Sequence, residues 1–239
     1  MDDALSADIE NTRGRLSVLA TPIGNLGDIT LRALDTLRAC DAIACEDTRV
    51  TAKLLARYEI SKPLLVYHAE SGRVAGTRIL ALLADIKHVV LVTDAGTPGI
   101  SDPGSELVAL VRERLPEVRI EAIPGPSALA AALSIAGVPA HEFVFMGFLP
   151  HKKGRQTKMK EIAAMNRVVV FYESPHRIEK ALGELAAVLP DTAHVVVLRE
   201  LTKMFESVVS GTVIEMQEHF KTHPKEVRGE FVVVVSPSA

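Results

Sequence analysis

Short runs rich in valine, isoleucine and leucine recur along the whole chain, and segments with helical spacing separate most of them. The nine runs lie at residues 15–20, 42–46, 63–68, 88–93, 119–123, 143–148, 167–172, 194–199 and 230–235. Two of the intervening segments carry apolar residues on one helical face: Leu31, Leu34 and Leu37, and then Ile178, Leu182, Leu185 and Leu189. Strands that alternate with helices predict an α/β fold, and nearly continuous apolar runs predict strands covered on both faces, as in parallel sheets.

The length of the chain bears on how many sheets these strands form. A chain of 239 residues, 48% of them hydrophobic, is able to bury one large core or two small ones. A Pro-Gly-Pro sequence at 124–126 interrupts the pattern near the middle of the chain. We therefore predict two α/β domains with mostly parallel sheets, at residues 14–123 and 124–239. The acidic segment 1–13 lacks an apolar signal core and is predicted to be a flexible tail.

Composition narrows the classes of function. The formal net charge is −3, so a nucleic-acid partner would have to be met by a local patch rather than by the field of the whole molecule. Cys40 and Cys45 show neither a disulfide framework nor a metal-binding spacing, and no HExxH sequence occurs, so we predict no metal. No apolar run approaches the roughly 20 residues of a membrane span. These observations favour a cytoplasmic protein without a membrane partner.

Four loops rich in glycine or proline follow predicted strands. They are TPIGNLGD at 21–28, DAGTPGISDPG at 94–104, PGPSA at 124–128 and YESPH at 172–176. Because open parallel sheets bind ligands at the carboxyl ends of their strands, we expect a ligand site where such loops gather.

The loop 94–104 has both a structural and a functional interpretation. Asp102 followed by a proline is typical of a helix N-cap and the first helical position, and Gly96 and Gly99 favour positive φ angles. Helix capping leaves Asp94 and its small neighbours unexplained. Small residues let the backbone approach a ligand closely, so this part of the loop is the predicted binding element.

The first loop invites comparison with dinucleotide-binding folds. Glu46 and Asp47 lie about 20 residues after it, where a ribose-binding acid is expected. However, Gly24 and Gly27 give only GxxG and Pro22 lies inside the turn, which argues against a nicotinamide-dependent oxidoreductase. The sequence also has no GxxxxGK[ST] motif of the nucleotide-hydrolysing kind.

Polar residues gather near two helix starts in the second half of the chain. Ser127, and Ser174 with Pro175, are predicted helix caps. The polar side chains beside the second cap, which form the candidate rim of a site, are Glu173, His176 and Arg177. The segment 151–160 carries five Lys and Arg residues and no acid, which is typical of a solvated loop or of a local phosphate-binding patch.

The sequences of these loops, together with four further motifs, follow one another along the chain in an order that is typical of one family. The order is ATPIGNLGDIT, CEDTR, VTDAGTPGISDPG, IPGPSA, GFLPHKKGR, FYESPHRI, RELTKMFE and GEFVVVV. This pattern resembles the tetrapyrrole methylase superfamily, and within it the branch that methylates small-subunit ribosomal RNA. The resemblance covers residues 14–236, and its most specific parts are DAGTPGISDPG and FYESPHR.

The resemblance implies two α/β domains with S-adenosylmethionine in the cleft between them, and a homodimer. It also implies 2′-O-methylation of a cytidine ribose of 16S rRNA, in the decoding region of the small ribosomal subunit. Methyl transfer to a hydroxyl is an in-line displacement in which the cofactor brings the reactivity. The protein is then expected mainly to hold the two reactants in alignment.

The resemblance, together with the basic segment and the needs of the chemistry, assigns residues to three roles. The expected cofactor contacts are Asp94, Ala95, Gly96, Thr97, Pro98, Ser127, Ala128, Met146, Phe171, Tyr172 and Phe231. The residues expected on the acceptor side or against RNA are Pro22, Gly24, Asn25, Lys152, Lys153, Arg155, Lys158 and Arg199, with Arg32 and Arg49 as further RNA candidates. The candidates for a general base, or for a charge that lowers the pKa of the ribose hydroxyl, are Glu46, Asp47, Glu173, Glu200, Lys203 and Arg199.

Two further interpretations compete with this one. The first is a methyltransferase of the same fold that acts on a tetrapyrrole or on a protein side chain, and the basic segment with FYESPHR argues against it. The second is a non-catalytic RNA-binding module. The intact small-residue loops argue against that module, because a protein without catalysis has no need to keep them.

Overall fold

The computed structural model describes residues 13–68, 72–102 and 104–237. The chain divides after Ser127 into two compact units, close to the Pro-Gly-Pro sequence that predicts a boundary after residue 123. Almost all of the predicted flexible tail, residues 1–12, lies outside the described residues.

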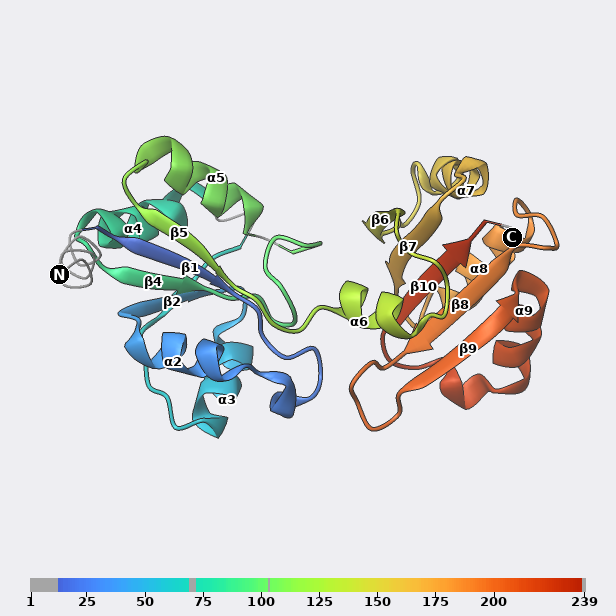
Figure 1. Ribbon diagram of the computed structural model, residues 1–239, viewed down its shortest axis with the longest axis horizontal. Helices are drawn as coiled ribbons and strands as arrows, with labels where there is room; N and C mark the ends of the chain where they lie inside the picture. Colours follow the sequence, from blue (N-terminus) through green and yellow to red (C-terminus); the bar gives the residue numbers. More distant parts are fainter. Residues whose placement is uncertain (1–12, 69–71, 103, 238–239) are drawn as a thin grey trace. The chain divides into compact units, whose positions relative to one another are not determined.

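The first unit is built on a sheet of five parallel strands with the order β3-β2-β4-β1-β5 (Figure 1). These strands are β1 (Arg15–Leu19), β2 (Ala42–Cys45), β3 (Leu64–Val66), β4 (His88–Leu91) and β5 (Arg119–Ile123). The helices between them are α2 (Leu31–Ala39), α3 (Thr48–Arg57), α4 (Gly72–Ala84) and α5 (Ser105–Arg114), with a short 3-10 helix η1 (Leu26–Asp28).

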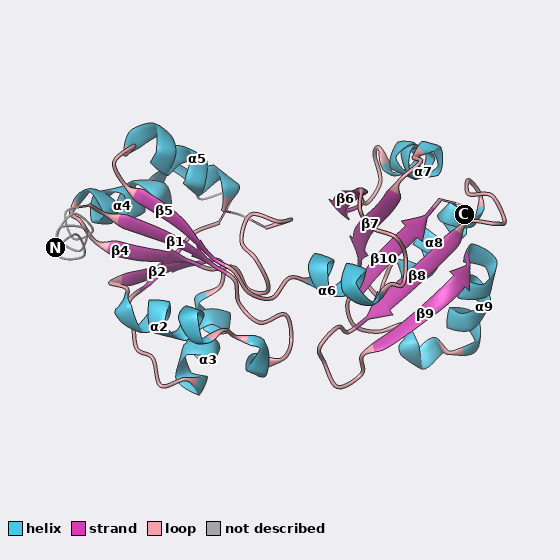
Figure 2. Cartoon of the chain, viewed as in Figure 1, coloured by secondary structure: helices cyan, strands magenta, loops and turns pink. Residues whose placement is uncertain are grey.

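Helices cover both faces of this first sheet (Figure 2). One apolar core packs α4 and α5 against residues such as Leu16, Val89 and Leu91. A second core packs α2 and α3 against the opposite face, around Leu19 and Ile43. The prediction of parallel strands covered on both faces is confirmed for this unit, and it explains why its strands are apolar at nearly every position.

The second unit holds a five-stranded mixed sheet with the order β6-β7-β10-β8-β9 (Figure 1). Its strands are β6 (Phe143–Phe148), β7 (Val168–Glu173), β8 (His194–Arg199), β9 (Ser207–Thr212) and β10 (Phe231–Ser236). Its helices are α6 (Ala128–Ile135), α7 (Arg155–Ala164), α8 (Ile178–Ala186) and α9 (Val213–Thr222), with a 3-10 helix η2 (Pro224–Glu226).

The expectation of a mostly parallel sheet is wrong for the second unit, although the α/β class with two sheets is confirmed. Only β6 and β7 run parallel, whereas β10 pairs antiparallel with β7 and β8, and β8 pairs antiparallel with β9. The valine-rich strands are nevertheless buried on both faces, because α7, α8 and α9 pack against one face and α6 packs against β10. Burial, rather than strand direction, therefore explains their apolar runs.

The sequence prediction missed one strand, β9. Its sequence SVVSGT has only two large apolar residues, and it lies at the edge of the sheet, where several of its side chains are exposed. Within the described residues, no helix is both long enough and apolar enough to cross a membrane.

Candidate functional site

The carboxyl edge of the first sheet joins the first two predicted loops. The backbone N–H of Thr21 donates to the carbonyl of Gly96 at 2.9 Å, and the N–H of Gly96 donates to the carbonyl of Thr21 at 3.1 Å. The Thr21 hydroxyl also donates to the carbonyl of Thr93 at 3.1 Å. The loops that follow β1 and β4 therefore lie side by side, as the position of a ligand site in a parallel sheet requires.

The PGP loop, which follows β5, meets the same edge. The hydroxyl of Thr97 donates to the carbonyl of Pro126 at 3.1 Å. A Cβ on Gly125 would lie 3.2 Å from the Cβ of Ala20, so only glycine lets these two segments approach each other without a shift. The expectation that these loops gather at one sheet edge is thus met by three of the four.

Gly96 is the residue on which this arrangement most depends. Its φ is +88°, a conformation that costs little only for glycine. A Cβ there would also lie 3.3 Å from a methyl carbon of Ile23 in the first loop. In the same segment Asp94 and Ala95 are exposed, whereas Pro98 is buried and supports the loop.

Asp94 links this edge to the loop that follows β2. Its carboxylate accepts a hydrogen bond from the backbone N–H of Asp47 at 3.1 Å. Asp47 is the N-cap of α3 and pairs with Arg49 at 2.6 Å. The hydrogen bonds from the Arg49 side chain and backbone lower the pKa of Asp47 to about 2, which makes Asp47 a weak base and occupies Arg49.

The predicted N-cap role of Asp102 is wrong. Helix α5 begins at Ser105, Gly104 occupies the N-cap position with a φ of +143°, and no side chain caps the helix. Asp102 is instead half-buried, and this burial, together with the negative charge of Glu46, raises its pKa to about 6. The charge of Asp94 adds to the rise, and the Thr93 hydroxyl opposes it.

The first-loop residues that were predicted to border the acceptor differ in exposure. Pro22 is buried, whereas Gly24 and Asn25 are exposed. The Asn25 side chain caps η1 by accepting a hydrogen bond from the backbone N–H of Gly27 at 3.0 Å. The turn is therefore held by its own hydrogen bonds, and its exposed tip is available for contact.

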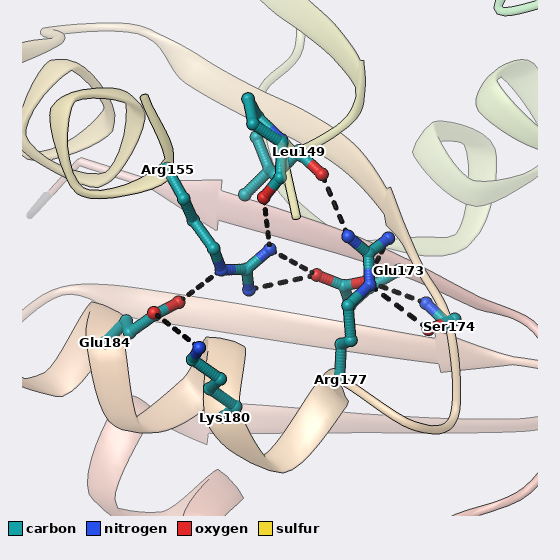
Figure 3. A network of polar contacts seen from close by, with 8 residues as sticks. Leu149, Arg155, Glu173, Ser174, Arg177, Lys180 and Glu184 are labelled. Carbon is teal, nitrogen blue, oxygen red and sulfur yellow. Dashed lines mark hydrogen bonds and ion pairs between the residues drawn. The ribbon is translucent and has the colours of Figure 1, made fainter. Parts of the chain in front are cut away.

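A buried ion-pair network lies at one end of the second sheet (Figure 3). Glu173, the last residue of β7, has a fully buried side chain that pairs with Arg155 at 3.1 Å and with Arg177 at 2.8 Å. The guanidinium of Arg155 also pairs with Glu184 on α8 at 2.6 Å. Burial of a carboxylate is costly, and here the two guanidinium groups offset that cost by pairing with both of its oxygens.

This network corrects two assignments. Glu173 is not available as a general base, because both of its carboxylate oxygens are engaged and no solvent reaches it. Arg155 does not contact RNA from its observed position, since its side chain is only 3% exposed and faces inward. Sequence alone gives no sign that these two residues, one on a helix and one on a strand, meet.

The two arginines of the network hold the basic loop in place. Arg177 donates to the carbonyl of Leu149 at 3.0 Å, and Arg155 donates to the carbonyl of Pro150 (Figure 3). Lys152 and Lys153 stand exposed on this loop, ahead of the positive-φ Gly154 that precedes α7. The segment 151–160 is therefore a short loop followed by a helix.

One expectation for this segment stays open and one for its neighbour is corrected. Lys158 belongs to α7, where it pairs with Glu161 at 2.6 Å and stays partly exposed, so its RNA contact remains a prediction. Ser174 and Pro175 do not cap α8 directly, because the helix begins at Ile178 and Arg177 occupies its N-cap position. The carbonyl of Ser174 instead accepts the hydrogen bonds that close the turn before α8.

The predicted aromatic contacts divide between the two faces of the second sheet. Tyr172 is half-buried and meets the rings of Phe145 and Phe148 edge-on, with centroids 5.0 and 5.4 Å apart. Phe171 and Phe231 point to the other face and belong to the apolar core, so their rings are not available to a ligand there. Met146 also packs against this core, partly buried.

The charged side chains of the loop between β8 and β9 pair with each other and with Glu230. Burial works against charge at both Glu200 and Lys203, but their hydrogen bonds with each other and with Glu230 outweigh it. The pKa of Glu200 is lowered and that of Lys203 is raised, so both stay charged and paired. Arg199 donates to the carbonyls of Phe205 and Arg228, which fixes the loop.

Residues that the sequence prediction missed lie beside Asp102. Thr93 is 3% exposed, and its hydroxyl has no hydrogen-bond partner in the part of the chain that the structure describes. Its place at the end of a predicted strand, directly before Asp94, is the signal that could have found it. No group of three His, Cys, Asp or Glu residues suited to a metal ion occurs among the described residues.

Relatives of known name share most of this chain. A ribosomal RNA small subunit methyltransferase I of Xylella fastidiosa is 44% identical over 230 residues, which cover 96% of this chain and 84% of that protein. The protein of the same name in Thermotoga maritima is 43% identical over 224 residues, covering 93% of this chain and 98% of that protein.

Solved structures share the fold at lower identity. A cobalt precorrin-4 methyltransferase superposes with a TM-score of 0.68 at 20% identity, covering 93% of this chain and 94% of that one. A uroporphyrin-III-C-methyltransferase from Thermus thermophilus gives a TM-score of 0.64 at 18% identity, covering 94% of each chain. Residues 15–217 match the family described as Tetrapyrrole (Corrin/Porphyrin) Methylases. This chain belongs to the tetrapyrrole methylase family and groups within it with the proteins named ribosomal RNA small subunit methyltransferase I.

Proposed function

We propose that this methyltransferase uses S-adenosylmethionine to methylate the 2′ oxygen of a cytidine ribose in the decoding region of 16S rRNA. The observation that carries the proposal is the carboxyl edge of the first sheet, where three small-residue loops are hydrogen-bonded around Gly96. The names of relatives at 43–44% identity support ribosomal RNA as the substrate. The choice of a cytidine and of its 2′ oxygen as the methyl acceptor goes beyond what these names say, and it is part of the proposal.

The residues at this edge fit the cofactor. Asp94 offers an exposed carboxylate to hydroxyl or amino groups, and Ala95 and Gly96 let a ligand approach the backbone. We propose that Asp94 to Pro98 hold the cofactor, with Ser127, Ala128 and Tyr172 as further contacts. When bound, the cofactor supplies a methyl group on a positively charged sulfur.

The protein's own residues then act mainly by positioning. Alignment of the acceptor oxygen with the methyl carbon removes much of the entropic barrier to an in-line displacement. The exposed Gly24 and Asn25 of the first loop are placed to border the acceptor. Of the predicted general bases, Glu46 is the one that makes no hydrogen bond or ion pair within the described residues.

The basic loop of the second unit is the proposed RNA contact. Lys152 and Lys153 are exposed, and Arg155 and Arg177 fix the backbone from which they project. Phosphate contacts of this kind supply affinity without reading the base sequence, so the shape of the small subunit would select the site. A homodimer would present this loop twice, and a cytoplasmic location follows from a ribosomal substrate.

A labelling experiment tests this function. The protein is incubated with S-adenosylmethionine tritiated in its methyl group and with small ribosomal subunits from cells that lack the endogenous activity. We expect label on the 2′ oxygen of one cytidine of 16S rRNA. Label on a base or on a ribosomal protein, or no label although the cofactor binds, would contradict the proposal.

A further inference from the structure

Three carboxylates meet at the carboxyl edge of the first sheet. Glu46 follows β2, Asp94 follows β4, and Asp102 comes from the loop before α5. Both Glu46 and Asp94 are close enough to raise the pKa of Asp102 by their charges, in addition to the effect of its partial burial. The fold thus holds Asp102 where ionisation is costly.

Among the described residues, the Asp102 carboxylate neither caps a helix nor forms an ion pair. Asp102 does not cap α5, because Gly104 occupies that position without a side-chain hydrogen bond. Within the described residues no lysine or arginine pairs with Asp102, and the nearby Arg49 is engaged by Asp47. A carboxylate kept at an energetic cost and without a structural role is typical of a functional site.

The hydroxyl of Thr93 is a second and independent observation. Thr93 is almost completely buried, and its Oγ1 atom has no hydrogen-bond partner among the described residues. Its backbone carbonyl accepts the Thr21 hydroxyl, which fixes the position of the residue. The Thr93 hydroxyl lies near enough to Asp102 to work against the rise in its pKa.

A single hydroxyl group on a ligand would match this pair. The ionised Asp102 carboxylate is an acceptor only, and the Thr93 hydroxyl is able to donate. A ligand hydroxyl has one proton to give and lone pairs to accept with. It would therefore satisfy both side chains at once, which a carbonyl, an acceptor only, or an ammonium group, a donor only, would not do.

We propose that Asp102 is the general base that accepts the proton of the methyl-acceptor hydroxyl, and that the Thr93 hydroxyl holds that oxygen in place. This assignment rests on the proposed function, since it needs an alcohol as the acceptor. It replaces Asp47, Glu173 and Glu200, whose carboxylates are engaged by arginine or lysine partners.

The step balances in atoms and electrons. The acceptor oxygen forms its bond to the methyl carbon while the carbon–sulfur bond breaks, and that bonding pair goes to the sulfur, which becomes neutral. The hydroxyl proton passes to a carboxylate oxygen of Asp102 in the same event. The carboxylic acid then loses this proton to water, and Asp102 is ready for the next turnover.

The surroundings of Asp102 give the pH dependence. The charged groups near it are Glu46 and Asp94, with the Asp47–Arg49 pair in the neighbouring loop. Because its pKa is about 6, Asp102 is ionised above that pH and protonated below it. The rate of methyl transfer should rise with pH to a plateau above about pH 7, and Glu46→Gln should move the midpoint of this rise to lower pH.

The first test compares the Asp102→Asn variant with a matched Asp191→Asn variant, which changes an exposed aspartate of the second unit. Three properties are measured: the affinity for S-adenosylmethionine, the single-turnover rate with its pH profile, and the melting temperature. We expect Asp102→Asn to bind S-adenosylmethionine within a few-fold of the unchanged protein by calorimetry. Its single-turnover rate should fall by about 100-fold, the size of a general-base effect, and lose its rise with pH. Asp191→Asn should match the unchanged protein in all three measurements.

The third measurement is the melting temperature of the protein, which needs no cofactor. Since the folded protein holds a proton on Asp102 up to about pH 6 and the unfolded chain only to about pH 4, ionisation of Asp102 destabilises the fold above that range. Asp102→Asn should therefore raise the melting temperature at pH 7.5 and lose this gain near pH 4. A lower melting temperature at pH 7.5 would show a structural carboxylate and overturn the inference.

The remaining outcomes separate this inference from the proposed function. An Asp102→Asn variant that keeps the rate and the pH profile of the unchanged protein overturns the role of Asp102 alone. Failure of the unchanged protein to methylate RNA overturns the proposed function instead. Thr93→Val, which keeps the shape of the side chain, should slow the reaction and, because the Thr93 hydroxyl lowers the pKa of Asp102, move the pH midpoint upward. An unaltered rate in that variant would contradict the positioning role.

Discussion

His88 shows how one buried polar residue is accommodated at the opposite end of the first sheet, away from the candidate site. Its Nδ1 atom lies 2.8 Å from Arg15, its Nε2 atom lies 2.8 Å from the Ser17 hydroxyl, and that hydroxyl donates to Glu121 at 2.7 Å. Since Arg15 is always a donor, Nδ1 accepts and the imidazole is neutral. Burial, with the charge of Arg15 second, lowers the pKa of His88 to about 4.

This network predicts a loss of stability in mild acid. The unfolded chain binds a proton at His88 below about pH 6.5, whereas the folded protein binds it only below about pH 4, so stability falls as the pH drops through that window. The loss should be on the order of 3 kcal/mol. Urea unfolding at pH 7 and pH 4.5 measures it, and the pH-dependent difference should shrink in His88→Asn but not in the exposed His141→Asn. Equal pH dependence in all three proteins would contradict this description of His88.

Individual residues also show where sequence reasoning reaches its limit. The positive φ of Gly96 was predictable, because glycine favours that conformation, whereas the ligand contact of Asp94 stays a prediction. Asp102 was misassigned because a following proline is typical of a helix start, whereas α5 begins only at Ser105. The alternation of a strand could have separated Tyr172 from Phe171, since neighbouring side chains face opposite sides of a sheet.

At the scale of elements, the Glu173 network connects β7, α7, the N-terminus of α8 and the basic loop. Both arginines are largely buried, so removal of the central carboxylate would leave Arg177 without its ion-pair partner and Arg155 with Glu184 alone. Breaking a buried pair in this way costs about 3–5 kcal/mol, whereas an exposed pair contributes about 1 kcal/mol or less.

The Glu173→Gln variant tests this difference. We expect it to destabilise the second unit by about 3 kcal/mol in urea unfolding. The matched variant Glu142→Gln removes the partner of Arg167 in an exposed pair and should change stability by less than about 1 kcal/mol. Similar small losses in both variants would mean that the buried network contributes little to stability.

The strands were predictable to a large extent, and their directions were not. Every run of branched apolar residues became a strand, because such residues fit a covered pleated surface. The sequence could not show that β8 turns back through a hairpin into β9, since β9 lacks an apolar run. The antiparallel pairing of β10 likewise depends on contacts far apart in the chain.

At the scale of the whole molecule, we propose that the first unit holds the cofactor and that the second unit contacts RNA through its basic loop. The net charge of −3 makes this local patch necessary. The two activities should therefore be separable by mutation, although one reaction needs both.

Charge reversal tests this separation. Lys152→Glu with Lys153→Glu should weaken binding to small ribosomal subunits by at least tenfold at low salt and reduce the salt dependence of binding, because fewer phosphates are neutralised. Cofactor affinity should stay unchanged. Lys87→Glu with Lys225→Glu makes the same change in net charge at exposed positions elsewhere and serves as the control. Equal weakening by both double variants would point to net charge rather than to the loop.

The most direct measurement of the central claim is the affinity for S-adenosylmethionine of two glycine variants, determined by calorimetry. Gly96→Ala and Gly137→Ala both place a side chain at a positive φ, which costs about 1 kcal/mol in stability, and at Gly96 the added Cβ also lies 3.3 Å from a methyl carbon of Ile23. Gly96 lies among the gathered loops. Gly137 follows α6 in the second unit, and a Cβ there would have nothing within 4 Å. We predict at least tenfold weaker cofactor binding for Gly96→Ala and unchanged binding for Gly137→Ala. Unchanged affinity in a folded Gly96→Ala variant would contradict a cofactor site at the carboxyl edge of the first sheet.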